Sequence, residues 1–192
     1  MAHKFNPESR HKLDNPQRRN LLPPEETLCR LGLKAGDSMA DIGCGTGYFT
    51  VPAARIVGSQ GKVYGLDIMA EMIEETKRKI EENHLTNIEL LQVREDDFML
   101  ADQTVQYAFA CLVAHEAEDL LLFFREAARI LQPTGRIVII EWTKQRSMMG
   151  PPPEHRLDSK DVADLLRQCS FSNMQQIAIN TEMYAVIAEK EM

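Results

Sequence analysis

The sequence predicts an α/β protein built around a parallel sheet with helices on both faces. First, short apolar segments alternate along the chain with segments of helical periodicity. Second, segments 105–112 and 136–142 are apolar almost throughout, as strands covered on both faces are. Third, a tight link at 180–182 joins the last two apolar segments, which we therefore expect to pair as antiparallel strands. These observations favour a doubly wound sheet with right-handed crossovers that closes in an antiparallel pair.

In the first half of the chain, each expected strand is followed or preceded by a helix. Helices are expected over 24–33, 48–57 and 69–83, and strands over 38–42, 62–66 and 87–93. Glu25-Glu26 favour the positive N-terminal end of the first helix, and Gly32 and Gly58 end the first two helices. Met72 and Thr76 belong to a stripe that the third helix buries, opposite a charged and solvated face.

The second half of the chain continues the alternation and then closes it. Strands are expected over 105–112, 136–142, 174–180 and 183–189, and helices over 118–131 and from 159 to about 169. Pro133-Thr134-Gly135 predicts a turn before the fifth strand. Asp158-Ser159 provide the N-terminal cap of the last helix.

Two segments fall outside this alternation. Residues 1–23 are polar and contain three prolines, so we expect no long regular structure there, and they form either a frayed tail or a lid. Residues 143–157 contain Gly150-Pro151-Pro152-Pro153, and a connection of this length is often a lid or a binding loop. With 192 residues, a single domain over 1–192 is the expectation.

Composition excludes several classes of function. The net charge is −7 and, outside the charged and solvated face of the third expected helix, the basic residues form no cluster beyond Arg18-Arg19, which disfavours a nucleic-acid partner. The four cysteines lack the spacing of a metal site or a disulfide framework, so we expect no metal and a reduced, cytoplasmic setting. No apolar run approaches the roughly 18 residues that span a bilayer, and the polar N-terminus does not read as a signal peptide.

A glycine-rich turn follows the first expected strand. The stretch Asp41-Ile42-Gly43-Cys44-Gly45-Thr46-Gly47 predicts a strand-to-helix turn in which backbone approaches a ligand closely. A dinucleotide fingerprint would need its third glycine at Tyr48, and a phosphate loop would need a Gly-Lys-Ser/Thr ending. The sequence therefore favours a cofactor without phosphates, and the alternative is a glycine turn that binds no ligand.

Polar side chains follow three further strands. Asp67 ends the second strand, 20 residues after Gly47, where an acidic residue can accept hydrogen bonds from ribose hydroxyls or simply cap a helix. Glu95-Asp96-Asp97 follow the third strand and could bind either a cation or an adenine amino group. Cys111 and His115 follow the fourth strand. Because parallel strands end at one edge of the sheet, these residues are expected to lie close together.

With these residues in place, the chain over about 24–192 resembles the class I S-adenosylmethionine-dependent methyltransferases. The stretch 41–47 matches the first motif of that family, Gly65-Leu66-Asp67-Ile68 looks like the second, and 91–96 occupies the place of the third. The stretch 127–136 is similar to a late family motif. The resemblance implies a Rossmann-like seven-stranded sheet of order 3-2-1-4-5-7-6 with strand 7 antiparallel. Within the family, the chain looks most like the small-molecule methyltransferases related to quinone biosynthesis.

The resemblance also implies roles for individual residues toward S-adenosylmethionine. The motif that begins at Asp41 would hold the methionine part through the backbone of its three glycines: Gly43, Gly45 and Gly47. Asp67 would take the ribose hydroxyls, and Ile68 or Met69 would pack on adenine. Cys111 would lie near the methionine part through its backbone.

At the adenine end, this chain departs from the family pattern. Where the family has glycine-aspartate, the chain has Arg94-Glu95, so Glu95 would accept the adenine amino group and Asp96 would offer its backbone N–H. The choice between Glu95 and Asp96 stays open at this point.

Methyl transfer is an in-line displacement for which an enzyme mainly supplies orientation, worth roughly 7–11 kcal/mol. A base is needed only if the acceptor must lose a proton. His115 is the best candidate, because the ordinary pKa of histidine suits proton transfer near neutrality, and the alternative is a hydrogen-bonded structural histidine. His155 is expected at the surface, and Tyr48 could face the sulfonium or pack in the core.

The expected function is methyl transfer to a small-molecule acceptor. One alternative is a module that binds S-adenosylmethionine without catalysis, and another is a nicotinamide-dependent oxidoreductase, which the missing fingerprint glycine disfavours. A homodimer is a further expectation. The sequence does not identify the acceptor.

Overall fold

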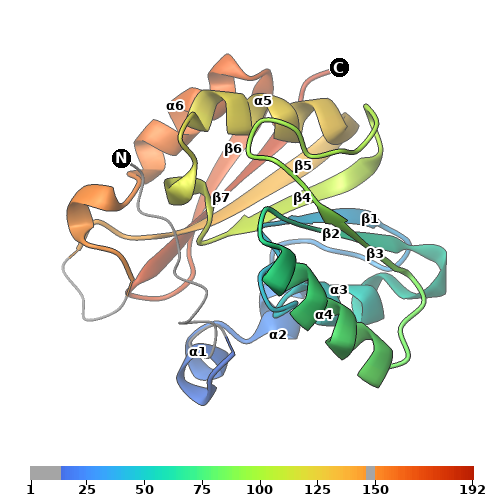
Figure 1. The fold of residues 1–192 in the computed structure, drawn as a ribbon. Helices are drawn as coiled ribbons and strands as arrows, with labels where there is room; N and C mark the ends of the chain where they lie inside the picture. Colours follow the sequence, from blue (N-terminus) through green and yellow to red (C-terminus); the bar gives the residue numbers. More distant parts are fainter. Residues whose placement is uncertain (1–13, 146–149) are drawn as a thin grey trace.

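The fold is described from a computed structural model, in which residues 14–145 and 150–192 are placed (Figure 1). The strands are β1 Ser38–Ile42, β2 Lys62–Asp67, β3 Ile88–Gln92, β4 Val105–Cys111, β5 Leu131–Trp142, β6 Phe171–Ala178 and β7 Met183–Lys190. The α-helices are α1 Pro16–Leu21, α2 Pro24–Arg30, α3 Thr50–Val57, α4 Ala70–Glu82, α5 Leu120–Ile130 and α6 Ser159–Gln168. Short 3₁₀ helices cover Gly58–Gln60, Ala114–Glu116 and Pro153–His155.

The seven strands form a single sheet of order β3-β2-β1-β4-β5-β7-β6. Strands β1 to β5 are parallel to one another, and β7 runs antiparallel to both β5 and β6. The predicted fold class and strand order are therefore confirmed. The order reverses at β1, whose Asp41 pairs with Gly65 on one side and Phe109 on the other.

Helices cover both faces of the sheet, as Figure 1 shows: α2, α3 and α4 on one side, α5 and α6 on the other. The alternation of side chains along β4 explains the two layers. Tyr107 and Phe109 pack into the core under α2 and α3, and Ala108 and Ala110 pack into the core under α5 and α6. Both cores are fully buried at the central strands, which accounts for the continuous apolar character of β4 and β5.

Two predicted segments differ from the structure. Residues 16–21 form the short helix α1, because Pro16 suits its first turn and the Asn15 side chain caps it by accepting from the Arg18 N–H at 2.8 Å. Strand β5 begins at Leu131, before the predicted turn at 133–135. The ladder steps from Val105–Leu131 to Tyr107–Arg136, so the intervening residues of β5 bulge out of register.

Some expectations fall on residues that are not described. The first half of the predicted N-terminal lid, residues 1–13, and part of the predicted loop, residues 146–149, lie outside the described residues. Within the described part of the chain, none of the helices is long and apolar enough to cross a membrane.

Candidate active site

A cavity of about 870 Å³ lies at the carboxyl ends of β1, β2, β4 and β5. Its volume is in the upper part of the roughly 300–1,000 Å³ range of small-molecule sites, which leaves room for a cofactor and an acceptor together. Of the predicted site residues, these line it: Asp41, Gly43, Gly45, Asp67, Ile68, Met69, Glu95, Cys111 and His115. Gly47 and Asp96 are not among the described residues that do.

The glycine turn is shaped by two positions that exclude side chains. Gly43 has a φ of +71°, and a Cβ there would lie 2.5 Å from a methyl group of Val113. Gly47 has a φ of +76°, and a Cβ there would lie 2.9 Å from Thr76 on α4. Gly43 therefore keeps backbone at the cavity wall, whereas Gly47 lets the turn pack against α4.

Asp67 at the end of β2 holds the glycine turn in place. One carboxylate oxygen accepts from the Gly45 N–H at 2.8 Å, and the other accepts from the Met69 N–H at 2.9 Å. Burial raises the pKa of Asp67 above its ordinary value, and the backbone N–H groups oppose that shift. Each oxygen has a second lone pair, so the carboxylate can still accept from ligand hydroxyls.

Asp41 lies beneath the same turn and is buried. Burial raises its pKa to about 7. The Thr50 hydroxyl, which donates to the carboxylate at 2.6 Å, opposes this shift. The nearby charge of Asp67 raises the pKa further. Two acidic groups thus lie under one turn, and Asp41 changes its protonation near neutrality.

Replacing Asp41 with asparagine is expected to alter how stability depends on pH. Between its unfolded pKa and about 7, the folded protein holds a proton on Asp41 that the unfolded chain releases, so wild-type stability falls as pH rises through this window. At about 1.36 kcal/mol per pKa unit, wild type loses about 4 kcal/mol of its free energy of unfolding across this window. D41N has no carboxyl group at this position, so its stability does not change with pH for this reason. Denaturant unfolding at pH 4 to 8 measures the difference. A gap between D41N and wild type that stays constant with pH would contradict the assignment.

The adenine end predicted from the sequence lies beyond β2 and β3. Ile68 lines the cavity and is 41% exposed. Its apolar side chain is therefore open to contact with a flat ring. Glu95 lines the cavity and accepts from the Glu118 N–H at 3.3 Å. Asp96 is exposed and accepts from the Arg94 guanidinium at 3.2 Å. The geometry therefore favours Glu95 over the Asp96 side chain as a ligand contact.

Thr46 carries a further polar group in the turn. Its hydroxyl oxygen is buried and has no hydrogen-bond partner among the described residues, although the residue lines the cavity. A buried hydroxyl without a partner costs stability unless a ligand or water supplies one. Together with the close backbone at Gly43, Thr46 suits a ligand that brings polar atoms to this turn.

His115 lines the cavity and forms a buried pair with Glu141. His115 Nδ1 lies 2.8 Å from one Glu141 carboxylate oxygen, and the His115 N–H donates to the other at 3.2 Å. The Glu141 side chain is 0% exposed and that of His115 is 4% exposed. Burial lowers the pKa of His115, but the hydrogen bond and charge of Glu141, together with the charge of Glu116, outweigh it, so that the pKa lies above its ordinary value.

Another part of the cavity wall is apolar and partly aromatic. Trp142, Pro151, Pro152 and Met183 line it. Gly150 has a φ of +78°, and a Cβ there would lie 2.7 Å from the Trp142 ring, so the chain packs directly on the indole. This wall suits a flat apolar molecule.

The buried guanidinium of Arg156 fixes the described part of the loop that forms this wall. It donates to the carbonyl oxygens of Pro151 at 2.8 Å and Thr143 at 2.9 Å. It also donates to the Gln145 carbonyl at 2.8 Å and lies 5.7 Å from the Trp142 ring centroid. His155, one residue earlier, is exposed, as predicted.

Tyr48 and Cys111 border the cavity without a reactive role of their own. Tyr48 is buried and donates its hydroxyl to the Leu22 carbonyl at 2.8 Å, and the Arg18 guanidinium lies 4.5 Å from its ring centroid. Its ring thus already faces a cation of the protein. Burial raises the pKa of Cys111 to about 12, so its thiol is protonated and a poor nucleophile at neutral pH.

A family model for the methyltransferase domain matches residues 33–189, which include every strand of the sheet except the end of β7. The chain belongs to the methyltransferase domain family. The resemblance read from the glycine turn, Asp67 and the late motif is thereby confirmed.

Two relatives place this methyltransferase more closely. The demethylmenaquinone methyltransferase of Geobacillus sp. (strain WCH70) is 30% identical over 133 residues, which are 69% of this chain and 56% of the relative. The chain thus spans about half the length of the curated relatives that it matches. The crystal structure of a SAM dependent methyltransferase from Aquifex aeolicus is 32% identical with a TM-score of 0.92, over 97% of this chain and 99% of that one.

The same fold occurs in a protein whose name describes a cyclisation and not a methyl transfer. The structure of the [4+2]-cyclase SpnF superposes with a TM-score of 0.77 at 15% identity, over 100% of this chain and 86% of that one. At this identity the likeness concerns the fold alone, so the residues of this methyltransferase must carry the functional argument.

Three site residues of this methyltransferase were missed in the sequence. Glu141 has a signal, because it is an acidic residue in the otherwise apolar run 137–142 of β5. Arg156 follows a proline-rich stretch and Arg18 lies in the polar N-terminal segment, where neither residue differs visibly from a solvated charge.

Proposed function

We propose that this protein is an S-adenosylmethionine-dependent methyltransferase whose acceptor is a small flat molecule with an ionisable hydroxyl. The observation that carries the proposal is that one cavity contains both a cofactor cradle and a proton acceptor. Asp67 and the glycine turn line this cavity, and so does His115, whose ring pairs with the buried Glu141 behind it.

The cradle fits the cofactor through its own groups. The Gly43 backbone at the cavity wall, the hydroxyl of Thr46 and the second lone pairs of Asp67 are polar positions that an adenosine compound can use. Ile68 and Glu95 supply an apolar surface and a hydrogen-bond acceptor for adenine. S-adenosylmethionine, when bound, supplies a methyl group that is already activated as a sulfonium.

In this proposal, His115 removes a proton from the acceptor. The Glu141 carboxylate accepts the Nδ1 proton of the ring, which leaves Nε2 as the basic nitrogen. The raised pKa of His115 makes Nε2 a stronger base than an ordinary imidazole. A hydroxyl that loses its proton here gains the electron density that attack on a methyl group requires.

The acceptor side favours an aromatic substrate. Trp142, Pro151 and Met183 give the cavity an apolar and partly aromatic wall, and His115 lines the same cavity. A relative with 30% identity is named a demethylmenaquinone methyltransferase, and the reduced form of such a quinone carries hydroxyls on a flat ring. We propose acceptors of this chemical type without choosing among them.

We further propose the organisation of the whole chain. Residues 1–192 form a single methyltransferase domain, in which 14–22 and the described part of 143–157 cover the cavity. The protein acts in the cytoplasm without a nucleic-acid partner, and light scattering of the purified chain tests whether it is a homodimer.

The function is tested by binding and turnover together. Calorimetric titration with S-adenosylmethionine should give a saturable heat, and incubation with methyl-labelled cofactor and reduced demethylmenaquinone should release S-adenosylhomocysteine and a labelled product. Simple hydroxylated naphthalenes and catechols extend the acceptor panel.

The outcomes separate the competing functions. Cofactor binding with no turnover on any hydroxylated acceptor would favour a binding module without catalysis. No heat at near-millimolar cofactor would overturn the proposal, and a fluorescence change on adding a reduced nicotinamide would instead favour an oxidoreductase.

A further inference from the structure

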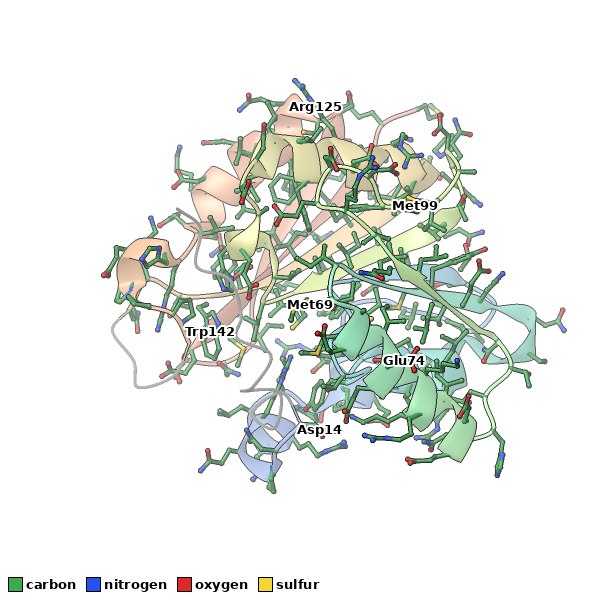
Figure 2. The ribbon with its side chains drawn as sticks, viewed as in Figure 1. Asp14, Met69, Glu74, Met99, Arg125 and Trp142 are labelled. Carbon is green, nitrogen blue, oxygen red and sulfur yellow. The ribbon has the colours of Figure 1, made fainter. Side chains whose placement is uncertain are left out.

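The N-terminal segment 14–22 is fastened over the cavity at several points. Asp14 pairs with Lys79 of α4 at 2.9 Å. The Asn180 side chain, beyond β6, donates to the Leu21 carbonyl at 2.9 Å. Leu22 is fully buried, and its carbonyl accepts from Tyr48. Figure 2 labels Asp14 beside α1, on the side of the molecule where this segment meets α4. The segment is therefore packed as part of the domain.

Arg18 extends from α1 into the lining of the cavity. Its guanidinium lies 4.5 Å from the ring centroid of Tyr48, which follows the glycine turn. Burial raises the pKa values of Cys111 and Asp41, and the positive charge of Arg18 opposes both shifts. Arg18 thus adds positive charge where the ends of β1 and β4 meet the cavity.

The positive charges around the cavity are unevenly distributed. Among the described residues that line it, the arginines are Arg18 and Arg94, and there is no lysine. Arg94 lies beyond β3 and pairs with Asp96 and Asp97 at 3.2 and 3.3 Å. It is therefore next to Glu95, at the proposed adenine end. Arg18 is the arginine at the other end of the cradle.

The cradle itself has a direction. Asp67 ends β2 and Cys111 ends β4, with β1 between them, so about 10 Å of sheet edge separates them at about 4.8 Å per strand. An extended ligand whose ribose lies at Asp67 brings its other end toward β4, and in S-adenosylmethionine that end is an amino acid. Its carboxylate needs a cationic partner once water is excluded.

We propose that Arg18 is the cationic partner of the cofactor carboxylate, so that segment 14–22 is part of the cofactor site. The inference rests on the proposed function, because it requires the cofactor to carry an amino-acid end. It also gives a reason for the fastening at Lys79, Asn180 and Tyr48, which holds α1 where Arg18 reaches the cavity.

The test compares two ligands that share the adenosine part. S-adenosylhomocysteine carries the amino-acid end, and 5′-methylthioadenosine lacks it. Replacing Arg18 with methionine keeps most of the apolar stem and removes the charge. We expect R18M to weaken S-adenosylhomocysteine about 10- to 100-fold in calorimetric titration and to leave 5′-methylthioadenosine within about twofold. R18K should recover part of the loss.

Arg19 supplies a matched control on the same helix. It also lies over Tyr48, at 5.5 Å, but its side chain is 55% exposed and pairs with Asp14 at 2.7 Å. R19M should bind S-adenosylhomocysteine and 5′-methylthioadenosine with affinities within about twofold of those of wild type.

Equal losses for both ligands in R18M would overturn the inference, because α1 would then act through the shape of the whole site. Unchanged binding of S-adenosylhomocysteine in R18M would also overturn it. If wild type binds neither ligand, the proposed function fails together with the inference. If wild type binds both ligands and R18M changes the two affinities equally, the inference alone fails.

Discussion

Replacing Glu141 with glutamine is expected to lower kcat for methyl transfer about 10²-fold or more while S-adenosylhomocysteine affinity stays within about twofold. Glutamine has nearly the shape of glutamate and can still accept from the His115 N–H. It removes the Glu141 charge, which raises the His115 pKa more than the charge of Glu116 does. The ring then becomes a weaker base, so the acceptor is deprotonated less readily.

The pH profile of the same variant separates a positioning role from a structural one. Only the neutral ring can accept a proton, so wild-type kcat/KM should rise with pH through the raised pKa of His115. In E141Q this limb should move to lower pH, because the carboxylate no longer stabilises the imidazolium. A fall in rate without movement of the limb would mean that Glu141 only supports the fold.

His115 itself should show the larger effect. H115Q removes the proton acceptor and is expected to lower kcat by about 10²–10⁴-fold with little change in cofactor affinity. His155, exposed on the loop after Pro153, provides the matched control, and H155Q should leave kcat within about twofold. If H115Q retains wild-type kcat on every acceptor that wild type methylates, His115 is a structural histidine.

The sequence predicted the parts of this molecule that depend on periodicity. Strands such as β4, whose Tyr107 and Phe109 face one core and Ala108 and Ala110 the other, are marked by apolar residues that must be buried on both faces. The glycine turn was predictable for a related reason, since the backbone at Gly43 and Gly47 excludes side chains.

Features that depend on distant pairing were not predictable in the same way. Glu141 meets His115 only because β5 lies beside β4 in the sheet, and the sequence separation of 26 residues carries no sign of that contact. Arg18 reaches the cavity because segment 14–22 is fastened to the domain through Lys79, Asn180 and Tyr48. Charged residues in a polar segment are ordinarily solvated, so the sequence does not mark Arg18 as one that lines the cavity.

Replacing Asp67, whose carboxylate accepts from two backbone N–H groups, is the second substitution with a large expected effect. D67N is expected to weaken S-adenosylhomocysteine about 10- to 100-fold, because hydrogen bonds to a charged acceptor are worth roughly 1.5–3 kcal/mol. Asparagine also turns one acceptor into a donor, which then faces the N–H of Gly45 or Met69. The exposed Asp96 is the control, and D96N should leave the affinity within about twofold.

Deoxyadenosines separate the two contributions of Asp67, because a disturbed glycine turn would weaken every adenosine ligand alike. If the carboxylate accepts from the ribose, wild type should bind adenosine more tightly than 2′-deoxyadenosine or 3′-deoxyadenosine, and D67N should lose that preference. The comparison is made by displacement of S-adenosylhomocysteine at one pH, since burial has raised the pKa of Asp67. A preference that survives unchanged in D67N would restrict Asp67 to holding Gly45 and Met69 in place, and the ribose contact would then have to come from another residue.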